Sequence, residues 1–185
     1  MQWNYFDGII CKKEGEVMRH QRILIIGCSG SGKSYFSREL HKVTQLPLVH
    51  LDQLYWKKGW EKRGKALFLK DLQSHLQQSS WIIDGNFDST LPLRMQYADL
   101  VICLDVPRIQ SLQGVTTRWF KHFGRTRVDM AVGCPEKIDM EFLQFVWTYQ
   151  EKIRPHILQQ LRESSVDTII FKSRKSAKAW LKNLT

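Results

Sequence analysis

A glycine-rich stretch near the beginning of the chain has the residue types and the spacing of a phosphate-binding loop. Residues 27–34 read Gly-Cys-Ser-Gly-Ser-Gly-Lys-Ser and fit the pattern G-x-x-x-x-G-K-[ST]. In such a loop, backbone N–H groups surround a phosphate, the lysine reaches the β- and γ-phosphates, and the final hydroxyl binds Mg²⁺. The pattern therefore predicts a site for ATP or GTP, with Lys33 as a catalytic group and Ser34 as a metal ligand. The predicted nucleotide-binding residues are Gly27, Cys28, Ser29, Gly30, Ser31, Gly32, Lys33 and Ser34.

The segments on either side of the loop agree with this interpretation. Residues 23–26 are apolar and mostly β-branched, which is typical of a buried strand. After the loop, Phe36, Leu40 and Val43 recur at helical spacing, so we expect a helix to leave it. A strand, the loop and a helix in this order are what the motif requires, because the helix N-terminus adds a partial positive charge beside the phosphate.

The rest of the chain repeats this alternation of short apolar segments and helical patterns. Four further strands are predicted at residues 46–51, 81–83, 99–104 and 166–171. Helices are predicted near residues 66–76, 112–119, 138–161 and 176–184, with a kink or a restart at Pro155. Five buried strands that alternate with helices predict an α/β fold, in which a parallel sheet is covered by helices on both faces.

Length and composition bound the organisation of the chain. With 185 residues, of which 43% are hydrophobic, the chain is large enough for one globular domain. We expect this domain to span residues 21–185. Residues 1–20 show no pattern of a helix or strand and are predicted to be a loosely ordered N-terminal extension, within which Met18 is an alternative start.

Charge and cysteine content narrow the class of protein further. No apolar run is long enough for a membrane span or a secretory signal, and the four cysteines show no metal-type spacing. A cytoplasmic protein with reduced cysteines is therefore expected. The formal net charge of +10 favours either nucleic acid or small anionic ligands as binding partners.

Three aspartates follow predicted strands directly, namely Asp52, Asp84 and Asp105. In an open parallel sheet, ligands bind at the carboxyl ends of the strands. We therefore expect these carboxylates to gather at the edge of the sheet that holds the phosphate-binding loop.

Several motifs together resemble the small bacterial P-loop kinases called topology modulation proteins, which are relatives of the adenylate kinases. The resemblance covers residues 22 to about 150. Its motifs are the loop 27–34, His50-Leu51-Asp52, Gly59-Trp60, Trp81-Ile82-Ile83-Asp84-Gly85-Asn86, Ala98-Asp99, Leu104-Asp105 with Pro107-Arg108, and Gly124-Arg125-Thr126-Arg127 through Gly133-Cys134-Pro135-Glu136-Lys137. The resemblance implies a nucleoside-monophosphate-kinase-like P-loop NTPase fold, with five parallel strands in the order 2-3-1-4-5 and a short lid at about residues 118–135.

The chain also departs from the pattern of its relatives. Ser29 stands where adenylate kinases usually have proline, and Tyr35 stands where most members have threonine. Residues 84–88 read Asp-Gly-Asn-Phe-Asp in place of Asp-Gly-Phe-Pro-Arg. The first and the third of these differences argue against AMP as the phosphate acceptor.

The resemblance also suggests roles for the strand-end carboxylates. Asp84 is predicted to hold Mg²⁺ together with Ser34, and Asp105 is a second candidate for that role. Asp52 is predicted to orient or deprotonate the acceptor. The alternative for Asp84 and Asp105 is a polar cap on a turn, and the alternative for Asp52 is a helix N-cap.

The basic segment after the fourth strand resembles the lid of these enzymes. Arg118, Arg125 and Arg127 are predicted to bind the triphosphate, because a guanidinium offers phosphate a planar fork of donors. A solvated basic face is the alternative. Arg94 is a candidate for an anionic group of the acceptor or for a surface ion pair, and the tryptophans Trp56 and Trp60 line the acceptor pocket or belong to the core.

The leading hypothesis is a Mg²⁺- and ATP-dependent kinase that acts on a small, unidentified acceptor, which can be a nucleotide, a nucleoside or another metabolite. Two alternatives remain at this point. The basic charge and the name of the resembling family suggest a nucleotide-dependent protein that binds DNA. A P-loop switch that hydrolyses nucleotide for a partner protein is the second alternative.

Overall fold

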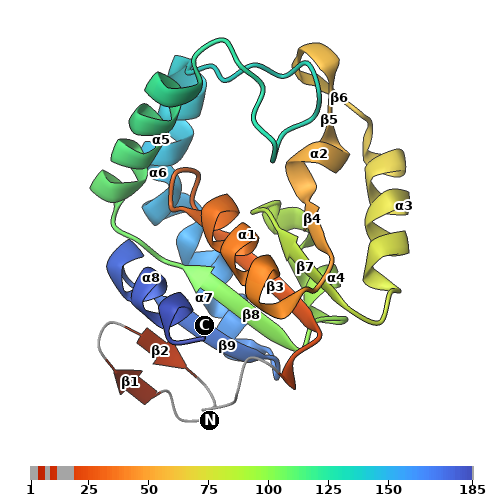
Figure 1. The fold of residues 1–185 in the computed structure, drawn as a ribbon, viewed down its shortest axis with the longest axis vertical. Helices are drawn as coiled ribbons and strands as arrows, with labels where there is room; N and C mark the ends of the chain where they lie inside the picture. The colour runs from red at the N-terminus through yellow and green to blue at the C-terminus, as the bar shows by residue number, and fades with distance from the viewer. Residues whose placement is uncertain (1–3, 7–8, 12–18, 185) are drawn as a thin grey trace.

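The computed structural model describes residues 4–6, 9–11 and 19–184, which form one sheet with helices on both faces (Figure 1). Five strands of the sheet are parallel, and their order is β4-β7-β3-β8-β9. Counted along the chain from β3, this is the order 2-3-1-4-5, so the predicted topology is confirmed. The five strands are β3 (Arg22–Gly27), β4 (Leu48–His50), β7 (Trp81–Asp84), β8 (Leu100–Leu104) and β9 (Asp167–Phe171).

Alternate residues of β3 show why both faces of the sheet are covered. Leu24 and Ile26 belong to one buried cluster, which also contains residues of α3, α5, α6 and α7. Ile23 and Ile25 belong to a second buried cluster with residues of α1 and α8. Side chains alternate between the faces of a strand, so an apolar run without interruption requires an apolar layer on each side.

The helices have the following bounds. They are α1 (Lys33–Thr44), α2 (Leu51–Tyr55), α3 (Lys65–Leu76), α4 (Leu91–Met95), α5 (Arg108–His122), α6 (Met140–Lys152), α7 (Arg154–Glu163) and α8 (Arg174–Lys182). The helix α7 begins with Pro155 in its first turn, which confirms the predicted restart. Smaller elements are the hairpin strands β5 (Trp56–Lys57) and β6 (Glu61–Lys62) and the 3₁₀ helices η2 (Lys58–Trp60) and η3 (Asp88–Thr90).

The N-terminal segment corrects one expectation. The strands β1 (Asn4–Phe6) and β2 (Ile9–Cys11) pair with each other, and β2 pairs with β9, so two antiparallel strands extend the edge of the sheet (Figure 1). Strands of three residues are too short to show a period in the sequence, and their partner β9 lies far along the chain. Met18, the alternative start, lies outside the described residues. None of the described helices has the length and the apolar character needed to cross a membrane.

Candidate active site

The phosphate-binding loop connects β3 to α1 at the carboxyl edge of the sheet. Gly27 ends β3, and Gly32 is the N-cap of α1, whose first residue is Lys33. Gly30 has φ +78°, and a Cβ atom there would collide with the carbonyl oxygen of Ser111 in α5. Glycine is therefore required at position 30 for backbone conformation and for close packing, and not only for the approach of a phosphate.

The Lys33 side chain points back into the phosphate-binding loop. Its Nζ donates a hydrogen bond to the carbonyl oxygen of Cys28 at 3.0 Å. Burial lowers the pKa of the Lys33 ammonium, and the negative charge of Asp84 acts in the opposite direction. The Ser31 hydroxyl is buried and has no hydrogen-bond partner among the described residues. A polar cradle with an inward-pointing cation and an unpartnered hydroxyl fits a phosphate group.

Asp84 lies beneath the first turn of α1, where the sequence placed a metal-binding carboxylate. The side chain is 4% exposed. It accepts hydrogen bonds from the Ser37 hydroxyl at 3.0 Å and from His50 Nδ1 at 2.7 Å. Ser37 also donates to the carbonyl oxygen of Ser34 at 3.2 Å, so one side chain links the two predicted metal ligands.

The hydrogen bond with Asp84 makes His50 easier to protonate than an ordinary histidine. Burial by itself lowers the pKa of His50, but the hydrogen bond and the charge of Asp84 outweigh it, so the pKa is raised. The ion pair between His50 and Asp84 in turn fixes the orientation of the carboxylate.

Asp52 lies in the first turn of α2 and lines the same cavity as Lys33. Burial raises the pKa of the Asp52 carboxyl, and the nearby charge of Asp84 raises it further, whereas Lys33 opposes the shift. A carboxylate with a raised pKa that faces a cavity is suited to accept a proton or a hydrogen bond from a bound hydroxyl group.

Asp105 is not available to a metal, which corrects its candidacy. The carboxylate accepts hydrogen bonds from Arg154 at 2.6 and 2.8 Å and from Lys172 at 2.5 Å. These contacts hold the pKa of Asp105 below its ordinary value even though burial acts in the opposite direction. Asp105 therefore ties β8 to α7 and to the end of β9.

Arg94 has a structural role and does not face an acceptor. The side chain is fully buried, and its Nε donates to Thr90 Oγ1 at 3.1 Å. Its Nη atoms donate to the carbonyl oxygens of Gly85, Asn86 and Phe87 at 2.9–3.1 Å. Burial lowers the pKa of Arg94 to about 9, which leaves the guanidinium charged at neutral pH. The turn after β7 thus folds around this guanidinium.

We expect Arg94→Ala to lower the free energy of unfolding by about 3–5 kcal/mol, because it leaves three buried carbonyl groups without donors. Arg94→Lys should restore little of this loss, since one ammonium cannot reproduce the planar fork. Urea unfolding monitored by circular dichroism measures the effect. The matched control is Arg108→Ala, which removes an ion pair to the exposed Glu151 and should cost less than about 1 kcal/mol. Equal effects of the two alanine variants would contradict this role.

Two of the three predicted lid arginines meet at one buried carboxylate. Arg118 Nε lies 2.8 Å from one oxygen of Glu136, and Arg127 Nε lies 2.6 Å from the other. Glu136 is 5% exposed, and both arginines line the cavity that contains Lys33. Arg125 is exposed and is not among the lining residues, so the structure does not bring it into the site.

The segment between α5 and α6, residues 123–139, crosses from these helices toward β5 and β6 (Figure 1) and contacts the segment around β5 and η2. The backbone of Gly59 donates to the carbonyl oxygen of Gly133 at 2.9 Å, and Trp60 Nε1 donates to that of Pro135 at 3.1 Å. Gln53 donates to the carbonyl oxygen of Val128 at 2.6 Å. The sequence placed a lid at about residues 118–135, but residues 118–122 belong to α5. We call the segment 123–139 the lid, and five of its residues line a cavity of about 640 Å³.

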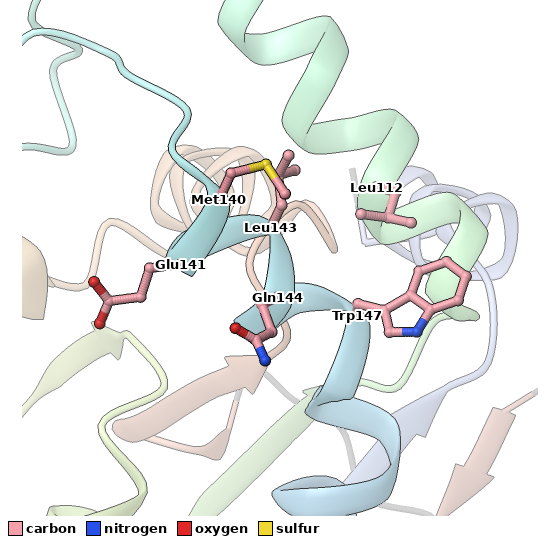
Figure 2. A pocket seen from close by; sticks show the side chains of 6 residues that line it. All are labelled: Leu112, Met140, Glu141, Leu143, Gln144 and Trp147. Carbon is pink, nitrogen blue, oxygen red and sulfur yellow. The ribbon is translucent and has the colours of Figure 1, made fainter.

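A second hollow of about 570 Å³ lies between α5 and α6 (Figure 2). Leu112 of α5 and Trp147 of α6 line it together with Met140 and Leu143, and none of its lining residues belongs to the phosphate-binding loop. Apart from Glu141 and Gln144, its lining is apolar. The hollow therefore lacks the groups that a phosphoryl-transfer site requires.

Comparison with known proteins identifies the fold. No protein-family model matches the chain, and no curated protein matches it in sequence. Its fold matches shikimate kinase from Acinetobacter baumannii in complex with shikimate, with a TM-score of 0.56 and 14% identity over 91% of this chain and 92% of that chain. The chain has a P-loop kinase fold.

Further solved structures agree with this fold. Shikimate kinase from Bacteroides thetaiotaomicron matches with a TM-score of 0.53 and 17% identity over 89% of this chain and 96% of that chain. Deoxyadenosine kinase from M. mycoides, with the products dCMP and dCDP bound, matches with a TM-score of 0.50 and 16% identity over 88% and 95%. At such identities the likeness concerns the fold, and it does not carry over an acceptor.

The side chains that could hold Mg²⁺ in this P-loop kinase fold are all oxygen donors. They are the Ser34 hydroxyl and the Asp84 carboxylate, and Ser37 bonds to this carboxylate and to the backbone carbonyl oxygen of Ser34. Among the described residues, no three His, Cys, Asp or Glu side chains form a ready metal site. This fits Mg²⁺ in kinases, which is held by one or two carboxylates together with substrate phosphates and water.

Three residues near the site were not assigned roles from the sequence. Glu136 joins Arg118 of α5 to Arg127 of the lid, and His50 forms an ion pair with Asp84. Asp129 of the lid pairs with Arg127 at 2.7 Å. Burial raises the pKa of Asp129, but Arg127 and a hydrogen bond with the Ser34 side chain outweigh it, so the pKa is lowered. The sequence signal that could have identified Glu136 and Asp129 is that they are acids within an otherwise basic segment.

We expect Glu136→Gln to lower the turnover rate kcat about tenfold or more, because it removes the charge that holds Arg118 and Arg127 side by side above the phosphate-binding loop. It should also lower the free energy of unfolding by about 1–3 kcal/mol. Steady-state kinetics and urea unfolding measure the two effects. Glu151→Gln, which changes the exposed partner of Arg108, is the matched control and should change neither. A Glu136→Gln variant with wild-type kcat would contradict this positioning role.

Proposed function

We propose that the protein is a Mg²⁺- and ATP-dependent kinase that transfers the γ-phosphoryl group of ATP to a hydroxyl group of a small molecule. The observation that carries the proposal is that Lys33, Asp52, Arg118 and Arg127 line one cavity beneath the lid. These residues come from four separate parts of the chain. Their convergence at the phosphate-binding loop is what a phosphoryl-transfer site requires.

Each group has a distinct role in the proposed reaction. Backbone N–H groups of the loop and Lys33 bind the β- and γ-phosphates, while Ser34 and Asp84 hold Mg²⁺, which neutralises phosphate charge. Arg118 and Arg127 stabilise the equatorial oxygens of the phosphoryl group in transfer. Arg125 is proposed only as an outer contact of the triphosphate, because its side chain is exposed.

The chemical step balances without a further reactant. The oxygen of the acceptor hydroxyl forms a bond to the γ-phosphorus, and the bond from that phosphorus to the β,γ-bridging oxygen breaks. ADP leaves with the electron pair of the broken bond, and the hydroxyl proton passes to Asp52. Because the transition state is loose, Asp52 acts mainly by orienting the hydroxyl.

We further propose that the chain is related to the topology modulation proteins, as its sequence motifs suggest. The Asp84-Gly85-Asn86 turn and the segment Gly133 to Lys137 support this relation, since both lie at the cavity or in the lid. The DNA-binding alternative finds no specific support in the arrangement of the site.

A coupled assay for release of ADP tests the proposal. The full chain is incubated with MgATP and a panel of nucleosides, nucleotides, sugars and hydroxy acids. At least one acceptor should stimulate ADP release and yield a phosphorylated product, and chelation of Mg²⁺ should abolish both. ATP hydrolysis that no acceptor stimulates but that a partner protein accelerates would instead indicate a switch.

A further inference from the structure

The part of the cavity that we assign to the acceptor is lined by aromatic side chains from several elements. Trp56, Trp60 and Phe87 line it from the segment between β4 and η3, and Phe142 and Phe145 line it from α6. Trp56 and Trp60 contact each other edge to face, with ring centroids 5.4 Å apart. Aromatic walls from several elements select a flat ring system, because stacking and edge contacts both require a π face in the ligand.

The charges of the cavity lining balance one another. Five basic and five acidic side chains line the cavity. Arg118 and Arg127 are both engaged with Glu136, and Lys137 lies 3.5 Å from Asp139. Once Lys33, Arg118 and Arg127 are assigned to the triphosphate, two basic lining residues remain, Lys62 and Lys137. The acids that remain beside Glu136 are Asp52, Asp88, Asp139 and Glu141. This part of the lining therefore does not favour an acceptor that carries a phosphate or a carboxylate of its own.

The acceptor side also offers no free guanidinium for an anion. Arg94, which follows the turn after β7, is fully buried and saturated by backbone carbonyls and the Thr90 hydroxyl. Among the described lining residues, the exposed Lys62 and Lys137 carry one ammonium each, and Lys137 lies over the Trp60 ring, 5.4 Å from its centroid. One ammonium cannot provide the bidentate geometry with which kinases hold a phosphate or carboxylate of the acceptor.

We infer that the acceptor is a nucleoside, that is, a hydroxyl-bearing molecule with a flat and uncharged heterocycle, and not a nucleoside monophosphate or a hydroxy acid. The base lies between the aromatic walls, and a sugar hydroxyl faces Asp52, which lines the cavity beside Lys33. This inference rests on the proposed kinase function and specifies its acceptor class.

Equilibrium binding tests the inference independently of turnover. Isothermal titration calorimetry is carried out on the full chain with saturating MgADP, which fills the phosphate-binding loop and prevents a monophosphate from binding there. The probes are adenosine, guanosine, cytidine and thymidine, their 5′-monophosphates, and shikimate. At least one nucleoside should bind about tenfold or more tightly than its own monophosphate and than shikimate. Trp56→Leu should weaken that binding about tenfold or more, whereas Trp147→Leu in the hollow between α5 and α6 should not change it.

The possible outcomes separate this inference from the kinase proposal. Tighter binding of any monophosphate or of shikimate than of every nucleoside overturns the inference, and so does the absence of nucleoside binding. If a monophosphate or shikimate is phosphorylated better than every nucleoside, the protein is a kinase but the acceptor class is wrong. If a nucleoside binds and is not phosphorylated, the pocket assignment holds and the kinase proposal fails.

Discussion

Replacing Lys33 with alanine is expected to lower kcat at least about 10³-fold, the largest effect of any single substitution in the site. The Lys33 ammonium already points into the phosphate-binding loop, where it contacts the Cys28 carbonyl oxygen at 3.0 Å. In the proposed reaction, it stabilises the charge that develops between the β- and γ-phosphates during transfer. The coupled assay for ADP release, with the acceptor at saturation, measures the loss.

The fold should tolerate this substitution. Burial disfavours the charged form of Lys33, so its removal is not expected to lower the melting temperature of the nucleotide-free protein. The matched control is Lys42→Ala on the same helix, which changes an exposed lysine that pairs with Glu39 and should leave kcat unchanged. Wild-type turnover in a folded Lys33→Ala protein would refute the assignment of the loop as a catalytic site.

Replacing Asp52 with asparagine is expected to lower kcat/KM for the acceptor about 10²-fold, with a smaller effect on ATP binding. Asparagine keeps the size and one acceptor oxygen of the side chain but cannot take the hydroxyl proton. In the wild-type protein, burial and the charge of Asp84 raise the pKa of Asp52 above the ordinary value of 3.8. Because the carboxylate is the active form, kcat/KM should fall as the pH decreases through that raised pKa. The asparagine variant should lack this dependence.

The stability of the Asp52→Asn protein gives an independent readout. An acid whose pKa is higher in the folded than in the unfolded state binds more protons when folded, so it destabilises the fold as the pH rises through that interval. The substitution should therefore leave the melting temperature at neutral pH unchanged or raise it. Asp71→Asn, which alters the ion pair between Arg63 and Asp71, is the control and should not change the pH profile. A pH profile that is the same in wild type and Asp52→Asn would rule out Asp52 as the titrating group.

Local patterns in the sequence were sufficient to place the phosphate-binding loop between a strand and a helix and to predict the layers of the fold. The loop motif needs only consecutive residues, and the uninterrupted apolar runs in β3, β7 and β8 require helices on both faces of the sheet. The carboxyl ends of parallel strands share an edge, so Asp52 and Asp84 could be placed near Lys33 before any coordinates were known. The resemblance of its motifs to those of P-loop kinases supplied the strand order.

Side-chain partners could not be predicted in the same way. Arg94 and Asp105 have the types and positions of ligand-binding residues, yet each is saturated by groups that only folding brings within reach. Glu136 joins Arg118 and Arg127 because the lid folds back over the cavity, and Arg125 points to solvent from the same segment. A residue type shows what a side chain can bind, but the desolvation and the neighbours that select its actual partner arise from contacts between distant segments.

The sequence by itself thus determined that the loop from Gly27 to Ser34 follows a buried strand and opens a helix, because that arrangement depends on neighbouring residues. The tertiary structure decided that Arg118 and Arg127 line one cavity with Lys33, that Asp105 is bound by Arg154 and Lys172, and that aromatic side chains from several elements line the same cavity. Those features depend on the packing of α6, the lid and the β5–β6 hairpin around one cavity, and no local pattern encodes that packing.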